Sequence, residues 1–427
     1  MQKLTLLFSD TELGEGNATD DFVEDELLLD TLEKNFHWGK KYPIDFVFNG
    51  DSFDFLKAPY KGKYPRHVTE SISLWKLAKI YRAHTSFFIT IGKCLKTNPR
   101  SRIIFIHGNH DFDLEFKRVQ TQIKEYITTD KEEQKRIIFP GFEMADGMLL
   151  IEHGSQMDDF FGVVPENLIY KTPTPASPEP FLMTPWGYNA LYDHYFAIKE
   201  EYPIVERLNP RARTIELLPL KLKKRIIIDS MWYMIKSFVY TQWRHRKDPI
   251  RKFPATDMRK YLTQFLEGEY ETKIDRKAKR KLLESKYYVL AVGHTHKPRV
   301  LKFRGKFIIN TGSWRDEYQL NEKEKCYMPR PKSYGFILHD EHHVQEIKII
   351  RRSSQQKPIQ IKDILKYTRR RKKMKVREQI KNRVRRIQRK DRVKEEKESL
   401  QAREMKIDPI IPKRKFIHQV FKKKNKN

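Results

Sequence analysis

The sequence predicts an α/β fold on the strength of two observations. Over the first 155 residues, short apolar segments rich in Ile, Val and Phe alternate with amphipathic segments that have the spacing of helices. This order is typical of a sheet whose strands are joined by crossover helices. Strand-like segments resume near residue 287, after a long insertion of different composition. The two stretches together predict one layered core with an insertion between its halves.

Nine segments are predicted to be strands. Several lack a strict alternation of apolar and polar residues, because strands buried on both faces need none. The segments are 4–8, 44–48, 103–107, 137–139, 148–152, 287–292, 307–310, 334–338 and 344–350. Residues 25–36 and 68–91 lie between the first three strands, and each is predicted to form one amphipathic helix. The segments 137–139 and 148–152 are expected to form a hairpin.

Residues 161–284 differ in composition from both flanking stretches. The segment 163–187 is rich in proline, which removes backbone donors, and is therefore predicted to lack regular structure. Aromatic-rich helices are expected after it, over residues 188–201, 217–240 and 257–266. Such an insertion is expected to cover the strand ends as a helical cap. The predicted organisation is a core of residues 1–160 and 285–350, a cap of residues 161–284 and a tail of residues 351–427.

Most of the positive charge of the chain lies in the tail. The chain has 86 Lys and Arg against 56 Asp and Glu, a net charge of +30, and residues 351–427 alone hold 30 basic and 8 acidic residues. Residues 361–404 contain no glycine or proline and only a thin apolar stripe, so the tail is predicted to be helical or disordered.

Three interpretations of the tail stay open. It is a solvated extension without a specific partner, it contacts an anionic membrane, or it contacts nucleic acid. Aromatic residues are sparse in it, which disfavours base stacking. Apolar residues recur at helical spacing, at positions 376, 380, 384 and 387, which favours a helix at a membrane surface.

Nothing in the sequence predicts secretion or a membrane span. The chain contains two cysteines and no CxxC pair, which favours a reducing compartment. The first ten residues do not resemble a signal peptide, and the apolar stretch 226–240 is interrupted by charges and too short for a bilayer. The predicted location is the cytoplasm, free or as a peripheral protein at the inner face of a membrane.

Five polar clusters are the strongest functional signal in the sequence. Each follows a predicted strand, so all five are expected at one edge of the core. The clusters are Asp10-Thr11-Glu12, Gly50-Asp51, Gly108-Asn109-His110-Asp111, His153-Gly154 and Gly293-His294-Thr295-His296. Carboxylate and amide oxygens mixed with imidazoles suit a pair of divalent cations such as Mn, Fe, Zn or Mg. A single aspartate after a strand is more often a turn or helix cap, but five clusters in series favour a metal site.

The clusters divide into two predicted sets of metal ligands. Asp51 is expected to bridge both ions, because a dinuclear site needs one carboxylate that touches both. The other predicted ligands are Asp10, Glu12 and His296 for the first ion, and Asn109, His153 and His294 for the second. Two such ions can clamp a phosphate and activate a water, so the expected reaction is attack of a metal-bound hydroxide on phosphorus.

His110 is the predicted catalytic side chain. An imidazole next to a ligand can stabilise the pentacoordinate phosphorus or protonate the departing oxygen. Asp111 is expected to orient the His110 ring and hold it protonated.

Other residues near the clusters have two possible roles. His107 is expected to pack behind the site, and Asp54 either supports the site or lies on a surface turn. Aromatic residues either line an apolar substrate groove or pack the cap on the core: Trp314, Trp186, Tyr188, Tyr192, Tyr195 and Trp232.

The order of these motifs resembles that of the calcineurin-like metallophosphoesterases, over about residues 1–160 and 285–320. That family carries Asp-x-His, Gly-Asp, Gly-Asn-His-Asp, a single His and Gly-His-x-His in this order. The resemblance implies a four-layer α/β/β/α sandwich, two bound metal ions with manganese favoured, and His110 as the catalytic imidazole. The chain departs from the family where Glu12 replaces a histidine. Glutamate can ligate, but it adds negative charge and favours harder metals.

Finer details are similar to the UDP-2,3-diacylglucosamine diphosphatases. The similar segments are 50–55 (GDSFDF), 105–109 (FIHGN), 153–154 (HG), 293–298 (GHTHKP) and 312–314 (GSW). The resemblance implies a lipid-linked nucleotide pyrophosphate as substrate and a helical cap that holds its acyl chains. The chain departs from this group in its longer insertion, its basic tail and His110 in place of arginine.

The predicted function is metal-dependent hydrolysis of a phosphomonoester, phosphodiester or pyrophosphate. A metal-dependent nuclease or phosphodiesterase is the first alternative, because such enzymes share the motifs and the tail can hold nucleic acid. The second alternative is a non-catalytic module that binds nucleic acid or membrane on this scaffold. The retained ligands disfavour the second alternative, because only the Glu12 position deviates.

Overall fold

The computed structural model describes residues 1–364, except 18, 159–160, 164, 186–187, 190, 219, 244–247 and 252–269. These residues belong to the first of two units, Met1–Thr368 and Arg369–Asn427. The helix expected over residues 257–266, Trp186 and the tail beyond residue 364 lie outside the described residues. The division into core, cap and tail stays a prediction.

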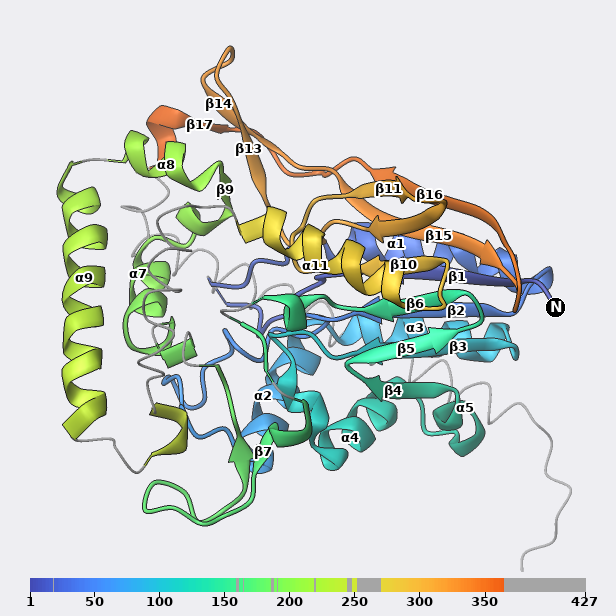
Figure 1. Cartoon of the computed structure of the whole chain (residues 1–427), viewed down its shortest axis with the longest axis horizontal. Coiled ribbons are helices and arrows are strands. Elements are labelled where there is room, and N and C mark those ends of the chain that lie inside the picture. The colour runs from blue at the N-terminus through green and yellow to red at the C-terminus, as the bar shows by residue number, and fades with distance from the viewer. Residues whose placement is uncertain are drawn as a thin grey trace, which may run out of the picture. The chain divides into compact units, whose positions relative to one another are not determined.

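The first sheet has six strands (Figure 1). Their order is β16 (Val344–Arg352), β15 (Lys332–His339), β1 (Lys3–Phe8), β2 (Ile44–Asn49), β3 (Ser101–Ile106) and β4 (Ile137–Gly141). Strands β1 to β4 are parallel, and β15 and β16 are antiparallel neighbours on the β1 side. The loops after β1, β2 and β3 therefore meet at one edge of the sheet.

The second sheet has five strands. Their order is β11 (Arg299–Phe303), β12 (Lys306–Asn310), β10 (Val289–Val292), β6 (Leu149–Glu152) and β5 (Glu143–Asp146). Strands β6 and β10 are parallel, so their following loops also share an edge. The hairpin predicted from residues 137–139 and 148–152 is wrong. Strand β4 joins the first sheet, and β5 is the antiparallel partner of β6.

An apolar layer separates the two sheets. Both sheets contribute to it, with Leu7, Val47, Ile104, Ile151, Val289 and Ile309. Side chains alternate along a strand, so Leu6 and Phe8 point to the opposite side of β1 and belong to a second core. That second core packs the first sheet against α1 (Asp25–Asn35), α2 (Glu70–Ala83), α3 (Thr85–Thr97) and α4 (Lys117–Ile127).

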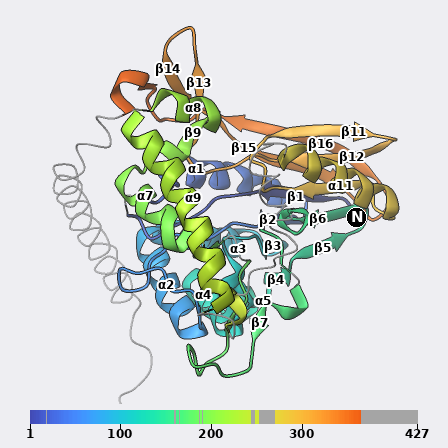
Figure 2. The same cartoon turned by 60° about the vertical axis from the view of Figure 1, so that its left-hand side comes forward.

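The outer face of the second sheet is covered by α11 (Tyr270–Glu284). Leu282 of this helix packs with Leu290 and Ile308 of the sheet. Figures 1 and 2 show the resulting order of helices, sheet, sheet and helix. The predicted four-layer α/β/β/α sandwich is therefore confirmed.

The single helix predicted over residues 68–91 is wrong. Two helices, α2 and α3, occupy this stretch and are separated at His84, which takes a non-helical conformation. The buried His84 ring lies with Nδ1 2.7 Å from Asp25 Oδ1 and Nε2 3.5 Å from Asp20 Oδ2. A buried polar ring needs partners, and the break turns this one towards two carboxylates.

The insertion contains short elements and one long helix. These are β7 (Ile169–Tyr170), β8 (Phe181–Leu182), the π-helical turn η5 (Leu191–Tyr195), α7 (Phe196–Glu201), β9 (Leu208–Asn209), α8 (Arg211–Leu217) and α9 (Leu220–Trp243). The pairing of β7 with β8 corrects the prediction that residues 163–187 lack regular structure. Figures 1 and 2 show α9 on the outside of the described unit.

A small sheet connects the insertion to the second half of the core. It contains β17 (Ile359–Gln360), β14 (Cys326–Pro329), β13 (Tyr318–Asn321) and β9. Short helical segments complete the described chain: η1 (Phe36–Lys40), η2 (Phe112–Glu115), α5 (Lys131–Lys135), η3 (Ser155–Met157), η4 (Pro165–Asn167), η6 (Val205–Arg207), η7 (Pro249–Arg251) and η9 (Ile361–Asp363). Among the described helices, none has the length and apolar character needed to cross a membrane.

Candidate metal centre

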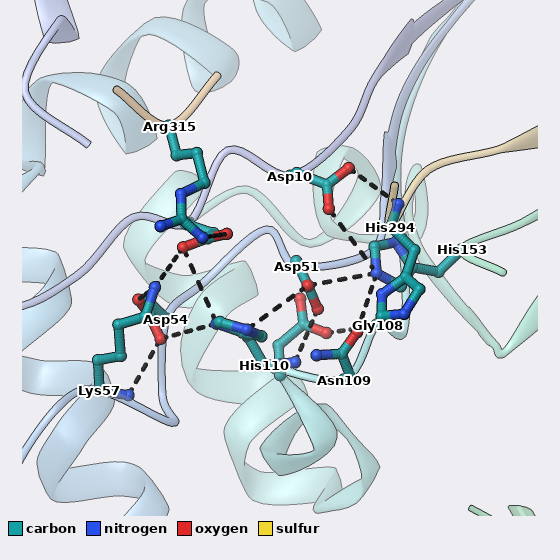
Figure 3. A network of polar contacts seen from close by, with 12 residues as sticks. Asp10, Asp51, Asp54, Lys57, Gly108, Asn109, His110, His153, His294 and Arg315 are labelled. Carbon is teal, nitrogen blue, oxygen red and sulfur yellow. Dashed lines mark hydrogen bonds and ion pairs between the residues drawn. The ribbon is translucent and has the colours of Figure 1, made fainter. Parts of the chain in front are cut away.

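The five polar clusters meet at one place, beyond the carboxyl ends of β1, β2, β3, β6 and β10 (Figure 3). The first sheet supplies the carboxylates and the amide, and the second sheet supplies the histidines. In chain order the predicted ligands are Asp10 and Glu12 after β1, Asp51 after β2, Asn109 after β3, His153 after β6, and His294 and His296 after β10.

The first group of ligand atoms, here named the His153 pocket, consists of Asp51, Asn109, His153 and His294. His153 Nε2 lies 3.2 Å from Asp51 Oδ2 and 3.2 Å from Asn109 Oδ1. The other ring nitrogen, Nδ1, lies 2.9 Å from the Asn49 carbonyl oxygen, which can accept its proton. This contact leaves the Nε2 lone pair for a cation. Ligand atoms of Asp51, His153 and His294 all lie within 4.8 Å of one another.

The second group, here named the Asp10 pocket, consists of Asp10, Asp51 and His296. Among the described residues, Asp10 Oδ1 is buried without a hydrogen-bond partner. The nearest imidazole nitrogens are His296 Nε2 at 3.1 Å and His153 Nε2 at 3.8 Å. Glu317 orients the His296 ring from behind, with its Oε1 2.8 Å from Nδ1. A buried carboxylate oxygen that faces imidazoles and lacks a donor fits a divalent cation.

The backbone conformation of the predicted ligands also indicates a functional site. Among the described residues, five of the eight non-glycine residues with positive φ are predicted ligands: Asp10 (52°), Glu12 (44°), Asp51 (50°), His294 (65°) and His296 (57°). Residues with a side chain rarely adopt this conformation, and its cost is retained mainly where a side chain must be aimed for function. The concentration of such residues at these strand ends therefore indicates a functional site.

Two glycines of the motifs allow the loops to approach closely. A side chain at Gly108 would collide with the Asp51 carboxylate. A side chain at Gly50, which has a φ of 75°, would collide with the His153 ring. Both motifs therefore need glycine directly before the ligand.

His110 also contacts Asp51. Its backbone N–H donates to Asp51 Oδ1 at 2.7 Å, and its ring Nδ1 lies 3.0 Å from Asp54 Oδ1. Burial alone would lower the pKa of His110, but the charges of Asp51 and two further carboxylates outweigh it and raise the pKa to about 9. A protonated imidazole at this position can stabilise negative charge or donate a proton.

The predicted pairing of Asp111 with the His110 ring needs correction. Asp111 Oδ1 accepts the Gly108 N–H at 2.6 Å, and Oδ2 accepts the Ser52 N–H at 2.7 Å. Asp111 thus holds the loops after β2 and β3 together. Asp54 is the carboxylate that meets the His110 ring, and it is fully buried, which excludes a surface turn.

Glu12 lies near the Asp10 pocket, but its oxygens face other groups. Its Oε2 lies 2.5 Å from Lys57 Nζ, and its Oε1 lies 3.3 Å from Arg315 Nη1. His296 Nε2 is farther away, 3.9 Å from Oε1. The structure therefore brings Glu12 to the other predicted ligands while two buried cations occupy its carboxylate.

Lys57 and Arg315 belong to a buried group of charges, here named the Glu12 ion cluster: Glu12, Asp21, Asp54, Lys57 and Arg315. Asp21 Oδ2 lies 2.8 Å from Lys57 Nζ and 3.2 Å from Arg315 Nη2. Residues of the insertion join the cluster, namely Lys199, Glu206 and Arg207. Sequence reasoning missed both cations, although Lys57 follows Asp54 by three residues and Arg315 directly follows the Gly-Ser-Trp segment.

A second set of close ligand atoms, from Glu12, Asp54 and His110, is less suited to a cation. Lys57 Nζ lies 2.5 Å from Glu12 Oε2 and 3.0 Å from Asp54 Oδ2. The lysine already balances this set, so a divalent ion would lie against an ammonium group.

Some of the aromatic residues near the clusters are buried in the core, and others are exposed. Trp314 is fully buried against Phe8, whereas Trp232 is 65% exposed, so the two do not line a common groove. His107 is buried behind the site, and burial lowers its pKa to about 3. The Tyr188 hydroxyl donates to the Asn109 carbonyl oxygen.

A small cavity of about 10 Å³ lies beside His110. Its lining mixes apolar and aromatic side chains with polar ones, among them Lys76 and Asp113. The residues that line it include Phe55, Leu56, Asn109, His110, Tyr188 and Tyr192.

Comparison with known proteins gives similarity only at the level of solved structures. No family model matches the chain, and no curated protein matches its sequence. A conserved protein of Streptococcus pneumoniae, described as a predicted phosphoesterase, is similar at 9% identity and a TM-score of 0.24, over 82% of this chain and 99% of that chain. A candidate 5′-nucleotidase of Staphylococcus aureus is similar at 12% identity and a TM-score of 0.28, over 86% of this chain and 58% of that chain. At these TM-scores the functional interpretation depends on the site itself.

Proposed function

We propose that this protein is a metal-dependent phosphoester hydrolase of the calcineurin-like metallophosphoesterase type. The convergence of ligand atoms from five strand ends on one carboxylate, Asp51, carries the proposal. Divalent cations at this place would polarise phosphoryl oxygens and lower the pKa of a coordinated water. The proposed ligands are those of the His153 and Asp10 pockets, and Mn²⁺ is the favoured metal.

His110 is the proposed proton donor. Its Nδ1 is held by Asp54, so Nε2, which lies 3.9 Å from Asp51 Oδ2, is the nitrogen directed at the metal centre. A proton on Nε2 can stabilise charge on the phosphoryl group and pass to the departing oxygen. Asp111 serves the reaction indirectly, because it fixes the loops that carry Asp51 and Asn109.

Hydrolysis of p-nitrophenyl phosphate, bis-p-nitrophenyl phosphate and a UDP-sugar lipid, each with and without Mn²⁺, tests the proposal. We expect turnover that chelation abolishes. The variant His110→Ala should lose roughly 10²- to 10⁴-fold in kcat while its Mn²⁺ content stays unchanged. The exposed His342→Ala serves as a control. Unchanged turnover in His110→Ala would remove the proposed proton donor, and no turnover with any metal would favour a non-catalytic binding module.

A lipid-linked nucleotide pyrophosphate is the substrate that we favour. The similarity of segments 50–55 and 293–298 to the UDP-2,3-diacylglucosamine diphosphatases supports it. A nuclease is the second candidate, supported by the net charge of +30. A nuclease should cleave DNA with Mn²⁺ and lose activity steeply as salt increases. A lipid hydrolase should instead respond to detergent and acyl length.

We also infer peripheral attachment to an anionic membrane, supported by the exposed face of α9. Residues spaced by three or four positions form an apolar stripe there: Ile228, Trp232, Ile235, Val239 and Trp243. Tyr233 fixes a different face of the helix, because its hydroxyl donates to Asp193 Oδ2 at 3.0 Å. Helices with tryptophan and aliphatic residues on an exposed face are typical of membrane interfaces. Basic residues near such a surface add attraction of about 1 kcal/mol each.

Sedimentation with phosphatidylcholine vesicles, with and without phosphatidylglycerol, tests this attachment. We expect binding only to the anionic vesicles, and a roughly tenfold loss in Trp232→Gln/Trp243→Gln. The exposed Ile89→Gln on α3 is the matched control and should bind normally. If a deletion beyond residue 364 abolishes binding and the α9 variant does not, the tail alone is the membrane element. A dimer that the α9 variant dissociates would instead make this stripe a contact between copies of the chain.

A further inference from the structure

Glu12 is unlike the other candidate ligands in what surrounds its side chain. Asp10 Oδ1 and Asp51 Oδ2 face imidazole nitrogens. Both oxygens of Glu12 face permanent cations at short range, Lys57 and Arg315. An imidazole can lose its proton and become a ligand, whereas an ammonium or guanidinium group keeps its charge.

The two cations are themselves held by several carboxylates. Lys57 Nζ lies 2.8 Å from Asp21 Oδ2 and 3.0 Å from Asp54 Oδ2. Arg315 Nη2 lies 3.2 Å from Asp21 Oδ2 and 3.4 Å from Glu206 Oε1. Both side chains are at most 5% exposed. Their positions are therefore fixed from several sides, and they do not move aside to release Glu12 without leaving buried charges unpaired.

A divalent cation bound by Glu12 would have to displace Lys57 from one oxygen or Arg315 from the other. It would also lie within a few ångströms of both positive charges, in a site that excludes water and screens charge weakly. The remaining donors of the Asp10 pocket are Asp10, Asp51 and His296. The His153 pocket has four donors, namely Asp51, Asn109, His153 and His294, and the His294 ring is oriented by Asp158, whose Oδ2 lies 2.8 Å from its Nε2.

We propose that Glu12 is an anion that binds Lys57 and Arg315 and is not a metal ligand, so that the two pockets differ in cation affinity. This inference rests on the proposed function. The His153 pocket retains one Mn²⁺, and the three-donor Asp10 pocket binds a second ion weakly and exchanges it. Glu12 then links the metal centre to the insertion, because Arg315 contacts Glu206 as well.

Titration of the metal-free full chain with Mn²⁺, and Mn²⁺ content after gel filtration, test the inference. We expect one retained ion and a second binding event that is roughly 100-fold weaker. The variant Glu12→Gln/Lys57→Met conserves net charge. It should change the dissociation constant of the weaker binding event by less than about threefold, since it removes an ion pair and no ligand. Asp10→Asn is the matched control, and it should weaken the second event at least about tenfold because it replaces a charged carboxylate donor with a neutral amide.

A gain of affinity provides an independent test. Glu12→His/Lys57→Met offers a neutral imidazole without an adjacent ammonium group, and we expect it to retain two Mn²⁺ ions per chain after gel filtration. If a pair variant does not fold, Glu12→Gln/Arg315→Gln replaces it, because that pair also conserves net charge. The inference, but not the proposed function, would be overturned by either of two results. One is a second binding event that is tenfold or more weaker in Glu12→Gln/Lys57→Met, and the other is a wild type that binds two ions equally tightly. A wild type that binds no Mn²⁺ would overturn the proposed function as well.

Discussion

The His153 pocket belongs to the candidate metal centre and the Glu12 ion cluster adjoins it, and the two differ in how their buried charges are balanced. In the pocket, the Asp51 carboxylate faces an imidazole whose far nitrogen is held by the backbone. In the cluster, Glu12 faces Lys57 and Arg315. Burial opposes the charge of Lys57, but the neighbouring carboxylates outweigh it and hold the pKa well above its usual value. The neighbours of a carboxylate, more than its place in a motif, therefore decide whether it is available to a cation.

The largest effect is expected from a change in the His153 pocket. The variant His153→Gln removes a donor whose Nε2 faces Asp51 and Asn109, and we expect loss of the retained Mn²⁺ and a fall in hydrolysis of about 1000-fold, or about 4 kcal/mol. Metal analysis and kcat/KM with p-nitrophenyl phosphate measure both. His339→Gln is the matched control, a buried histidine hydrogen-bonded to Thr5. Retained metal and activity in His153→Gln would remove the pocket from the site.

A change in the Glu12 ion cluster is expected to act on stability. Lys57→Met leaves three buried carboxylates with one cation fewer, and we expect a loss of about 3–5 kcal/mol in the free energy of unfolding, measured with urea. Lys34→Met is the control, because that lysine pairs with Asp30 on the surface and should change the free energy by less than about 0.5 kcal/mol. Equal and small effects would show that Lys57 does not hold Glu12, and would return Glu12 to the candidate ligands.

The sequence predicts well those features of the molecule that depend on residues close together in the chain. Strands β1, β2 and β3 appear as apolar runs, and glycine before Asp51 and Asn109 is recognisable because close approach requires it. The four-layer arrangement follows from the order of such segments together with the motif resemblance. Local patterns do not, however, assign strands to sheets, and the placement of β4 and β6 in different sheets was not predictable from their apolar character.

The parts that sequence predicts poorly depend on contacts between distant segments. Asp111 follows His110 directly, yet Asp54, 56 residues away, meets the ring. Glu12 lies at a ligand position of the motif, and its environment is set by Arg315, 303 residues away. No periodicity or spacing rule reports such contacts. They arise only when the two sheets bring their loops together.

The smallest effect is expected at the edge of the ion cluster, where His84 contacts Asp20, the neighbour of Asp21. Burial lowers the pKa of His84, but the contacts of its ring with the Asp20 and Asp25 carboxylates outweigh it and raise the pKa to about 10. A raised pKa means that this stabilisation is complete below the unfolded value of 6.5 and is lost as the pH rises through 10. The contribution should be about 1–3 kcal/mol, since part of the ionic gain offsets the cost of burial.

Urea unfolding of the wild type and His84→Gln at pH 7 and pH 10 isolates this contribution. Other groups that titrate near pH 10 contribute equally in both proteins. The difference between the two proteins in the free energy of unfolding lost from pH 7 to pH 10 is therefore due to His84. We expect the wild type to lose about 1–3 kcal/mol more than the variant on going to pH 10. Parallel losses would show that His84 is uncharged in the folded protein. In that case the loop that carries Asp21 is held by Lys57, Lys199, Arg207 and Arg315 without help from the helix break.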